Sequence, residues 1–99
     1  MRLGHLSSDL ARIASFMEIP NEEQATKSVI HESKFFAEWT APEADLETQM
    51  LLAEIQEFLA RMETKWDSSY PHPEWKQNCA QQLRDWADTL LKKAGFFND

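Results

Sequence analysis

Two short stretches carry residue types that metal binding would require, at a spacing that can be tested. His31-Glu32 begins like the zinc-protease pattern His-Glu-x-x-His, but Phe35 stands where the second histidine is needed. Without two histidines four residues apart, a helix offers no two-ligand face for zinc. None of the three histidines follows a Glu by three residues, which is the spacing that di-metal helical bundles use. The sequence therefore predicts no metal site and no cofactor.

Cys79 is the one cysteine and the only thiol nucleophile of the chain. It falls within an apolar stripe, and His72 lies in the loop before the same predicted helix. A catalytic thiol needs an exposed setting, a lowered pKa and a partner base. The chain also has no Gly-rich phosphate loop and no Gly-x-Ser-x-Gly turn. We therefore expect a protein that is not an enzyme.

Three large aromatic side chains occur within five residues, between positions 35 and 39. On a helical wheel Phe36 lies with the main apolar stripe, whereas Phe35 and Trp39 form a second patch four residues apart. Neighbouring helices either bury this flank, or leave an aromatic patch with an acidic rim that is typical of a protein interface. The candidate partner-binding residues are Phe35, Trp39, His31 and Glu32.

The remaining tryptophans allow a second kind of site. Indole rings and thioether chains fill ordinary cores, but they also line pockets for apolar or aromatic ligands. The residues concerned are Trp66, Trp75, Trp86, Met50 and Met62. The candidate ligand groove lies at the end of the molecule where two of them flank a loop, and it consists of Trp66, Trp75 and Tyr70.

Helices are the elements that must position these side chains. Apolar residues recur three or four positions apart almost everywhere, and strict alternation is absent, so the fold class is predicted to be all-α. We expect helices over about residues 6–18, 22–39, 41–66 and 73–94. The boundaries depend on Asn21 as an N-cap, on a Thr40-x-x-Glu43 capping box, on Pro73 as a first helical residue and on Gly95 as a C-cap.

Short connections between amphipathic helices favour antiparallel neighbours. The prediction is thus a single domain over residues 1–99, an up-down four-helix bundle in which helices 3 and 4 are longer than helices 1 and 2. Unequal lengths leave part of the apolar stripe of the long pair uncovered. Either the helix ends diverge, or a second subunit covers them.

Charge narrows the choice of partners. The formal net charge is −7, and residues 18–63 carry 11 Asp or Glu against 3 Lys or Arg. Nucleic-acid binding needs clustered cations, so it is not expected. No apolar run approaches the roughly 20 residues of a membrane span, and the single cysteine excludes an internal disulfide, so we expect a cytoplasmic protein.

The leading functional prediction is a non-enzymatic, acidic protein-interaction module. It would self-associate or dock a partner protein through the aromatic residues beside helix 2 and the ends of helices 3 and 4. The alternative is a small bundle that binds an apolar or aromatic ligand in the region of Trp66, Trp75 and Trp86.

Overall fold

The computed structural model describes residues 2–19, 22–40, 42, 44–69 and 72–93; within these ranges the side chains of Arg2, Trp39, Thr40 and Ser69 are not described. The described residues form four α-helices and no strand. The helices are α1 (Arg2–Met17), α2 (Glu23–Thr40), α3 (Leu46–Ser69) and α4 (Pro73–Lys93). The all-α fold class predicted from the apolar spacing is confirmed.

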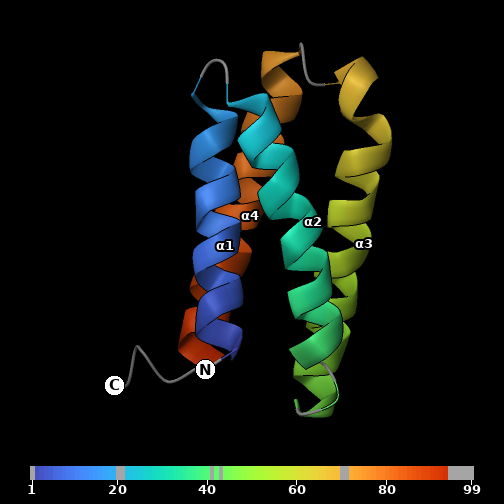
Figure 1. The fold of residues 1–99 in the computed structure, drawn as a ribbon. Coiled ribbons are helices and arrows are strands. Elements are labelled where there is room, and N and C mark those ends of the chain that lie inside the picture. Colours follow the sequence, from blue (N-terminus) through green and yellow to red (C-terminus); the bar gives the residue numbers. More distant parts are fainter. Residues whose placement is uncertain (1, 20–21, 41, 43, 70–71, 94–99) are drawn as a thin grey trace.

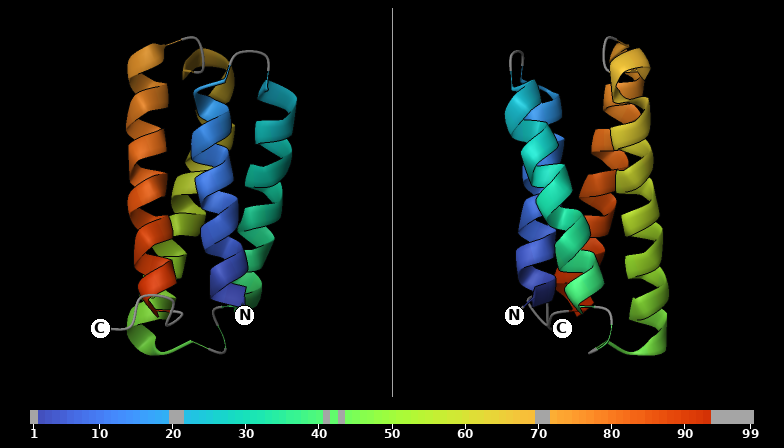
Figure 2. Two further views of the ribbon diagram at one scale, coloured as in Figure 1. Left: turned by 90° about the vertical axis from the view of Figure 1, so that its left-hand side faces the viewer. Right: turned by 45° about the vertical axis from the view of Figure 1, so that its right-hand side comes forward.

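The helices run alternately up and down, as the predicted bundle requires (Figures 1 and 2). α1 packs against both α2 and α4, and α3 packs against α2. α3 and α4 have 24 and 21 residues, whereas α1 and α2 have 16 and 18. The up-down bundle with a longer second pair of helices is therefore also confirmed.

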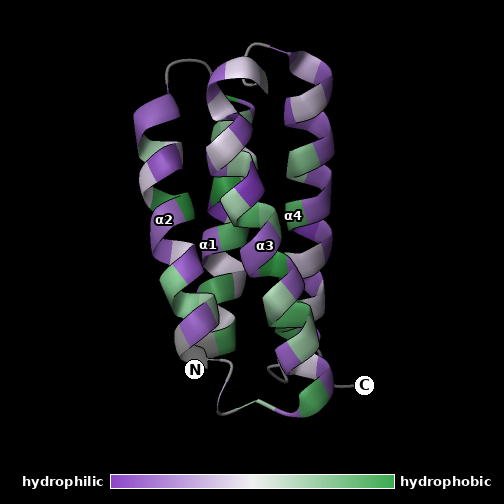
Figure 3. Cartoon of the chain, turned by 90° about the vertical axis from the view of Figure 1, so that its right-hand side faces the viewer, coloured by the Kyte–Doolittle hydropathy of each residue, from purple (hydrophilic) through white to green (hydrophobic). Residues whose placement is uncertain are grey.

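The core is made of apolar side chains that the helical period places on one face of each helix. In α1 the predicted stripe is fully inside, because Leu6, Leu10, Ile13 and Met17 are all buried. Each such side chain contributes roughly 1.5–3 kcal/mol through the apolar surface it removes from water. Figure 3 shows the complementary pattern, with hydrophilic residues along much of the outer surface of the helices.

Side-chain size decides how closely the helices approach one another. α1 and α4 pack tightly, and the Ser7 hydroxyl donates a 2.7 Å hydrogen bond to the carbonyl oxygen of Ala87 across this small-residue contact. The backbones of α3 and α4 approach each other much less closely than those of the other neighbouring pairs. Bulky aromatic side chains occupy the space between α3 and α4.

Two helix ends lie beyond their predicted positions. α1 begins at Arg2, about one turn before the predicted start, and Leu3 from this extra turn packs against the core. α3 continues to Ser69, three residues past the predicted end at Trp66. The contact of Leu3 with the core stabilises the extra turn of α1, and periodicity within one segment does not reveal it.

The predicted start of the third helix is wrong. Thr40 is the last residue of α2, and α3 begins at Leu46 rather than at about residue 41. Asp45 is the cap, because its Oδ1 accepts a 2.7 Å hydrogen bond from the backbone N–H of Thr48, the third residue of α3. An aspartate at this position satisfies an amide that has no partner within the helix, so α3 begins after Asp45 instead of after Thr40.

Pro73 is the first residue of α4, as predicted. The expected caps at Asn21 and Gly95 lie outside the described residues. Over the part of the chain that the structure describes, none of the helices combines the length and the apolar character needed to cross a membrane.

Candidate functional site

The predicted aromatic patch beside α2 begins at Phe35, whose side chain is on the surface. Phe35 is 58% exposed, and its ring meets the ring of His31 edge to face with 5.1 Å between centroids. His31 and Glu32 are exposed as well. Trp39 is among the residues whose side chains the structure does not describe. Phe36, one residue further on, packs against the core and stacks on His5 of α1 at 6.1 Å.

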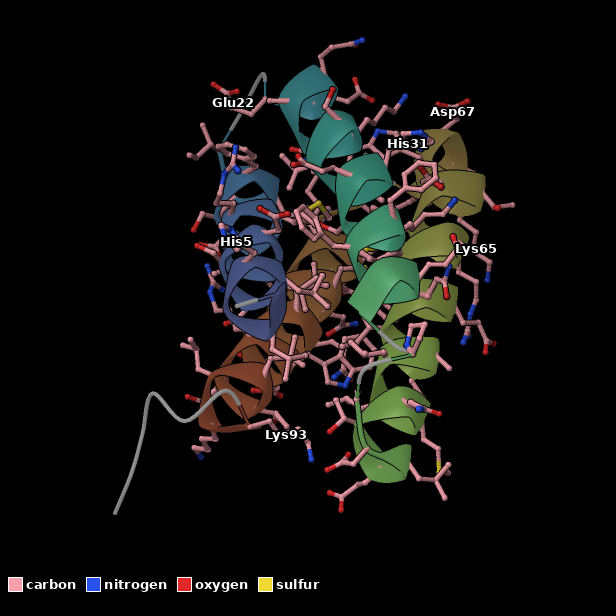
Figure 4. The ribbon with its side chains drawn as sticks, turned by 60° about the horizontal axis from the view of Figure 1, so that its bottom comes forward. His5, Glu22, His31, Lys65, Asp67 and Lys93 are labelled. Carbon is pink, nitrogen blue, oxygen red and sulfur yellow. The ribbon has the colours of Figure 1, made fainter. Side chains whose placement is uncertain are left out.

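His31 and Glu32 belong to different flanks of α2. His31 Nδ1 lies 3.6 Å from Oε2 of Glu63 on α3, and Figure 4 shows its ring on the α3 side of α2. The carboxylate of Glu32 instead acts on Asp9 of α1, where it helps to raise the pKa of that buried carboxyl. Phe35 therefore shares a surface with His31, whereas Glu32 lies on the side of α2 that faces α1.

Ion pairs between α2 and α3 show the register of the two helices. Lys34 Nζ lies 2.7 Å from Oε1 of Glu63, and Lys27 Nζ lies 3.9 Å from Oδ1 of Asp67. Continuing this antiparallel register at 1.5 Å per residue places the end of α2 level with about residue 57 of α3. The first turns of α3 consequently extend past the end of α2, and they project downward in Figure 1 and in the right-hand view of Figure 2.

This projecting part of α3 carries two exposed apolar side chains. Leu46 is 72% exposed and Met50, one turn later, is 62% exposed. α4 reaches this end of the molecule from another side, where Lys93 Nζ lies 3.1 Å from Oε1 of Glu47. We refer to Leu46 and Met50 as the α3 tip. The sequence analysis left Met50 open between a core residue and a pocket residue beside the tryptophans, and the structure places it on the outside of the bundle instead.

Trp66 of the predicted ligand groove is a core residue. It is only 1% exposed, and its Nε1–H donates a 2.6 Å hydrogen bond to Oε1 of Glu23. Its ring packs edge to face on Trp75, with 5.8 Å between centroids. Trp75 is half-buried, and Tyr70 lies outside the described residues.

A partly open cavity lies between α3 and α4, next to the Trp66–Trp75 pair. Its volume is about 150 Å³. A second edge-to-face pair, Phe58 and Trp86 at 5.1 Å, joins the same two helices further along. The residues around the cavity are Phe58, Arg61, Met62, Lys65, Trp75 and Cys79. Of the two predicted groove residues that the structure describes, Trp75 lines it and Trp66 does not.

Phe58, Arg61, Lys65 and Cys79 line the cavity but were not predicted for this site, and the spacing of the aromatic residues offers a signal for Phe58. Phe58 and Trp66 lie eight residues apart on α3, and Trp75 and Trp86 lie eleven apart on α4. Eleven residues return to within about 20° of the same direction, whereas eight leave an offset of about 80°, so the aromatic residues of each helix share a broad face and can meet across the two helices. Because α3 and α4 are antiparallel neighbours, the aromatic residues of one helix pair with those of the other. Cys79 lies between Trp75 and Trp86 in the sequence, and its small side chain leaves the space between the two pairs unfilled.

Cys79 itself is buried, and loss of solvent raises the pKa of its thiol to about 11. Burial of this kind disfavours the thiolate, which is the nucleophilic form. Within the described ranges, no three His, Cys, Asp or Glu side chains are placed to hold a metal ion.

Among the described residues, Asp9 is a second titratable group whose pKa is raised by burial. It lies on α1 with its side chain turned inward, and desolvation together with the Glu32 charge raises its pKa, while Arg12 and His5 oppose this shift. Its Oδ1 lies 3.4 Å from Arg12 Nη1, whereas Oδ2 has no hydrogen-bond partner among the described residues.

Comparison with known proteins gives no further guidance: no protein-family model matches the chain, and neither the curated proteins nor the solved structures include a significant match.

Proposed function

We propose that this protein is a non-enzymatic interaction module that self-associates or docks a partner protein through exposed apolar side chains. The observation that carries the proposal is the α3 tip, where Leu46 and Met50 are 72% and 62% exposed on turns that α2 does not cover. Exposed apolar side chains that adjoin one another commonly mark protein interfaces. Phe35, with His31 beside it, adds a second apolar surface on α2.

The surroundings of the α3 tip have the composition of an interface rim. Asp45 and Glu47 flank Leu46 in sequence, and Lys93 from α4 pairs with Glu47. An apolar centre with a charged periphery is the usual anatomy of a protein interface, and the charges select the partner and its orientation. The acidic excess of residues 18–63 favours either a basic partner surface or a symmetric contact that keeps the carboxylates apart.

The experiment is the solution mass by light scattering, measured over protein concentration and salt. We expect wild type to form a dimer that the double substitution Leu46→Gln and Met50→Gln disrupts. Ile19→Gln is the matched control, because Ile19 is also an exposed apolar residue, at 45%, but lies at the end of α1. Since all three side chains are exposed, none of the variants should unfold the bundle.

A monomer at every concentration would exclude self-association and leave docking of another protein. A photo-crosslinking residue placed at position 50, with position 19 as the control, then tests that possibility in cell extract. Adducts confined to position 50 agree with the proposal. Equal labelling at positions 50 and 19, or none at either, contradicts it.

The second candidate function is binding of a small apolar or aromatic ligand. The observation that favours it is the cavity between α3 and α4, which Trp75 and Phe58 line with their rings. Ligand sites are concave and mostly apolar, with a few polar groups that set orientation. Perturbation of tryptophan fluorescence by ring-sized ligands would support this function, and no response to any such ligand would oppose it.

A further inference from the structure

The cavity between α3 and α4 exists because two aromatic pairs hold the helices apart. Phe58 with Trp86 and Trp66 with Trp75 act as spacers on either side of it. Cys79, one of the lining residues, has too short a side chain to fill the space that the rings create. The space is partly open to solvent and has a volume of about 150 Å³. An apolar cavity of roughly this volume accommodates one benzene-sized ring.

Two cationic side chains line the cavity, although the chain as a whole is acidic. These are Arg61 and Lys65, which lie four residues apart on the same flank of α3. Arg61 Nη2 is 3.0 Å from Oε1 of Glu57, so its charge is largely offset. No ion pair joins Lys65 to another described residue, and Figure 4 shows its side chain on the outer surface of α3.

We propose that this cavity binds a small aromatic carboxylate. The ring would occupy the space between the two aromatic pairs, and the carboxylate would lie at the mouth, beside Lys65. Edge-to-face contact with Trp75 is the favoured geometry for an added ring, and a charge-assisted hydrogen bond from an ammonium group to a carboxylate is stronger than a neutral one. The volume limits the ligand to about one ring. This inference rests on the second candidate function.

A bare cavity between aromatic residues would accept neutral rings as readily as charged ones. The unpaired cation at the mouth is what distinguishes the two ligand classes, because it attracts an anion and repels a cation. Lys65 is solvent-exposed, so the preference is modest and declines as salt screens the charge. The proposed recognition is independent of the α3 tip, since neither Leu46 nor Met50 lines the cavity.

The test compares benzoate with its neutral isostere benzamide on the full chain at pH 7 and low salt. Binding is followed by amide and indole signals in ¹H–¹⁵N spectra, with the Trp75 indole signal identified from Trp75→Phe. We expect both ligands to shift the Trp75 signal, and benzoate to bind about fivefold more tightly than benzamide. Addition of salt should reduce this ratio toward one.

Two variants locate the ligand. Lys65→Gln removes an exposed charge without touching the core, and it should abolish the preference for benzoate while benzamide still binds. Lys92→Gln is the matched control, because Lys92 is an exposed lysine paired with Asp88 on α4 and does not line the cavity. Cys79→Leu fills the cavity, so it should eliminate binding of both ligands, and a retained helical spectrum confirms that it folds.

The outcomes separate this inference from the function on which it rests. Benzamide that binds as tightly as benzoate overturns the carboxylate inference but leaves a ligand-binding bundle. No spectral change with either ligand at millimolar concentration overturns both. A benzoate preference that survives Lys65→Gln, or binding that survives Cys79→Leu, places the ligand elsewhere and also overturns the inference.

Discussion

The indole Nε1–H of Trp66, near the end of α3, donates a 2.6 Å hydrogen bond to Oε1 of Glu23 in the first turn of α2. The two residues are 43 positions apart, and the donor belongs to a side chain that is 1% exposed. The bond therefore joins α2 to α3 at a point where a core indole needs a polar partner.

Glu23→Ala should lower the free energy of unfolding by about 1–2 kcal/mol, because a buried donor loses a charged acceptor. Glu23→Gln retains an acceptor and should cost less. Urea unfolding followed by circular dichroism measures both, with Gln24→Ala as the control for an exposed neighbour. In a Trp66→Phe background the Glu23→Ala cost should nearly vanish, and an undiminished cost there would show that the hydrogen bond is not its cause.

Asp9→Asn should stabilise the protein at neutral pH. Burial and the neighbouring Glu32 raise the pKa of Asp9 above its ordinary value, so the native state binds a proton more tightly than the unfolded state. Protonation thus favours folding, and the wild-type free energy of unfolding should fall as pH rises through the interval between the ordinary and the raised pKa. The penalty then persists at all higher pH.

The measurement for Asp9 is urea unfolding of wild type and Asp9→Asn from pH 3 to pH 8. The gap between the two proteins should be smallest at the acid end and should open as pH rises. Asp85→Asn is a control, because Asp85 is an exposed aspartate on α4. A gap that is constant with pH would mean that the Asp9 carboxylate is not destabilised in the folded protein.

The Cys79 thiol should react slowly in the folded state. Its pKa of about 11 leaves a much smaller thiolate fraction at pH 8 than an unperturbed cysteine has, and the side chain is buried. We expect reaction with an aromatic disulfide reagent at pH 8 to be at least about 100-fold slower for the native chain than for the chain in denaturant. Comparable rates in the two states would show that the thiol is accessible and ionised more readily than its surroundings imply.

Asp45→Ala should destabilise the first turn of α3. The hydrogen bonds from Thr48 lower the pKa of Asp45, so the carboxylate contributes stability that is present above its ordinary pKa and is lost as pH falls through the lowered value. Asp45→Asn should retain the capping geometry without the charge. Thermal unfolding at pH 7 should rank the midpoints as wild type, Asn and Ala, and the first two should converge at acid pH, below the lowered pKa of Asp45.

The sequence predicted the fold because the signals that define it are local. The period of Leu6, Leu10, Ile13 and Met17 specifies a helix and its buried face within one segment, and all four residues are in the core. Short connections then leave few arrangements other than antiparallel neighbours. The number of helices and the greater length of α3 and α4 therefore followed without tertiary information.

Helix ends were predicted less well, because competing caps cannot be ranked from a single segment. Thr40 and Asp45 both begin plausible capping sequences, and the structure has α2 continuing through Thr40 and α3 starting after Asp45. The choice depends on where the chain can turn while α2 and α3 remain in register through Lys34 and Glu63. That register is a relation between segments far apart in the sequence.

The candidate sites depended most on the tertiary structure. Trp66 and Trp75 carry the same ring and both fall on apolar stripes, yet one is buried and hydrogen-bonded while the other lines a cavity. Phe35 remained ambiguous between core and surface until its 58% exposure was known. Periodicity indicates which face of a helix turns inward. How wide a part of that face the neighbouring helices cover depends on the distance between the helices. Aromatic pairs set that distance between α3 and α4.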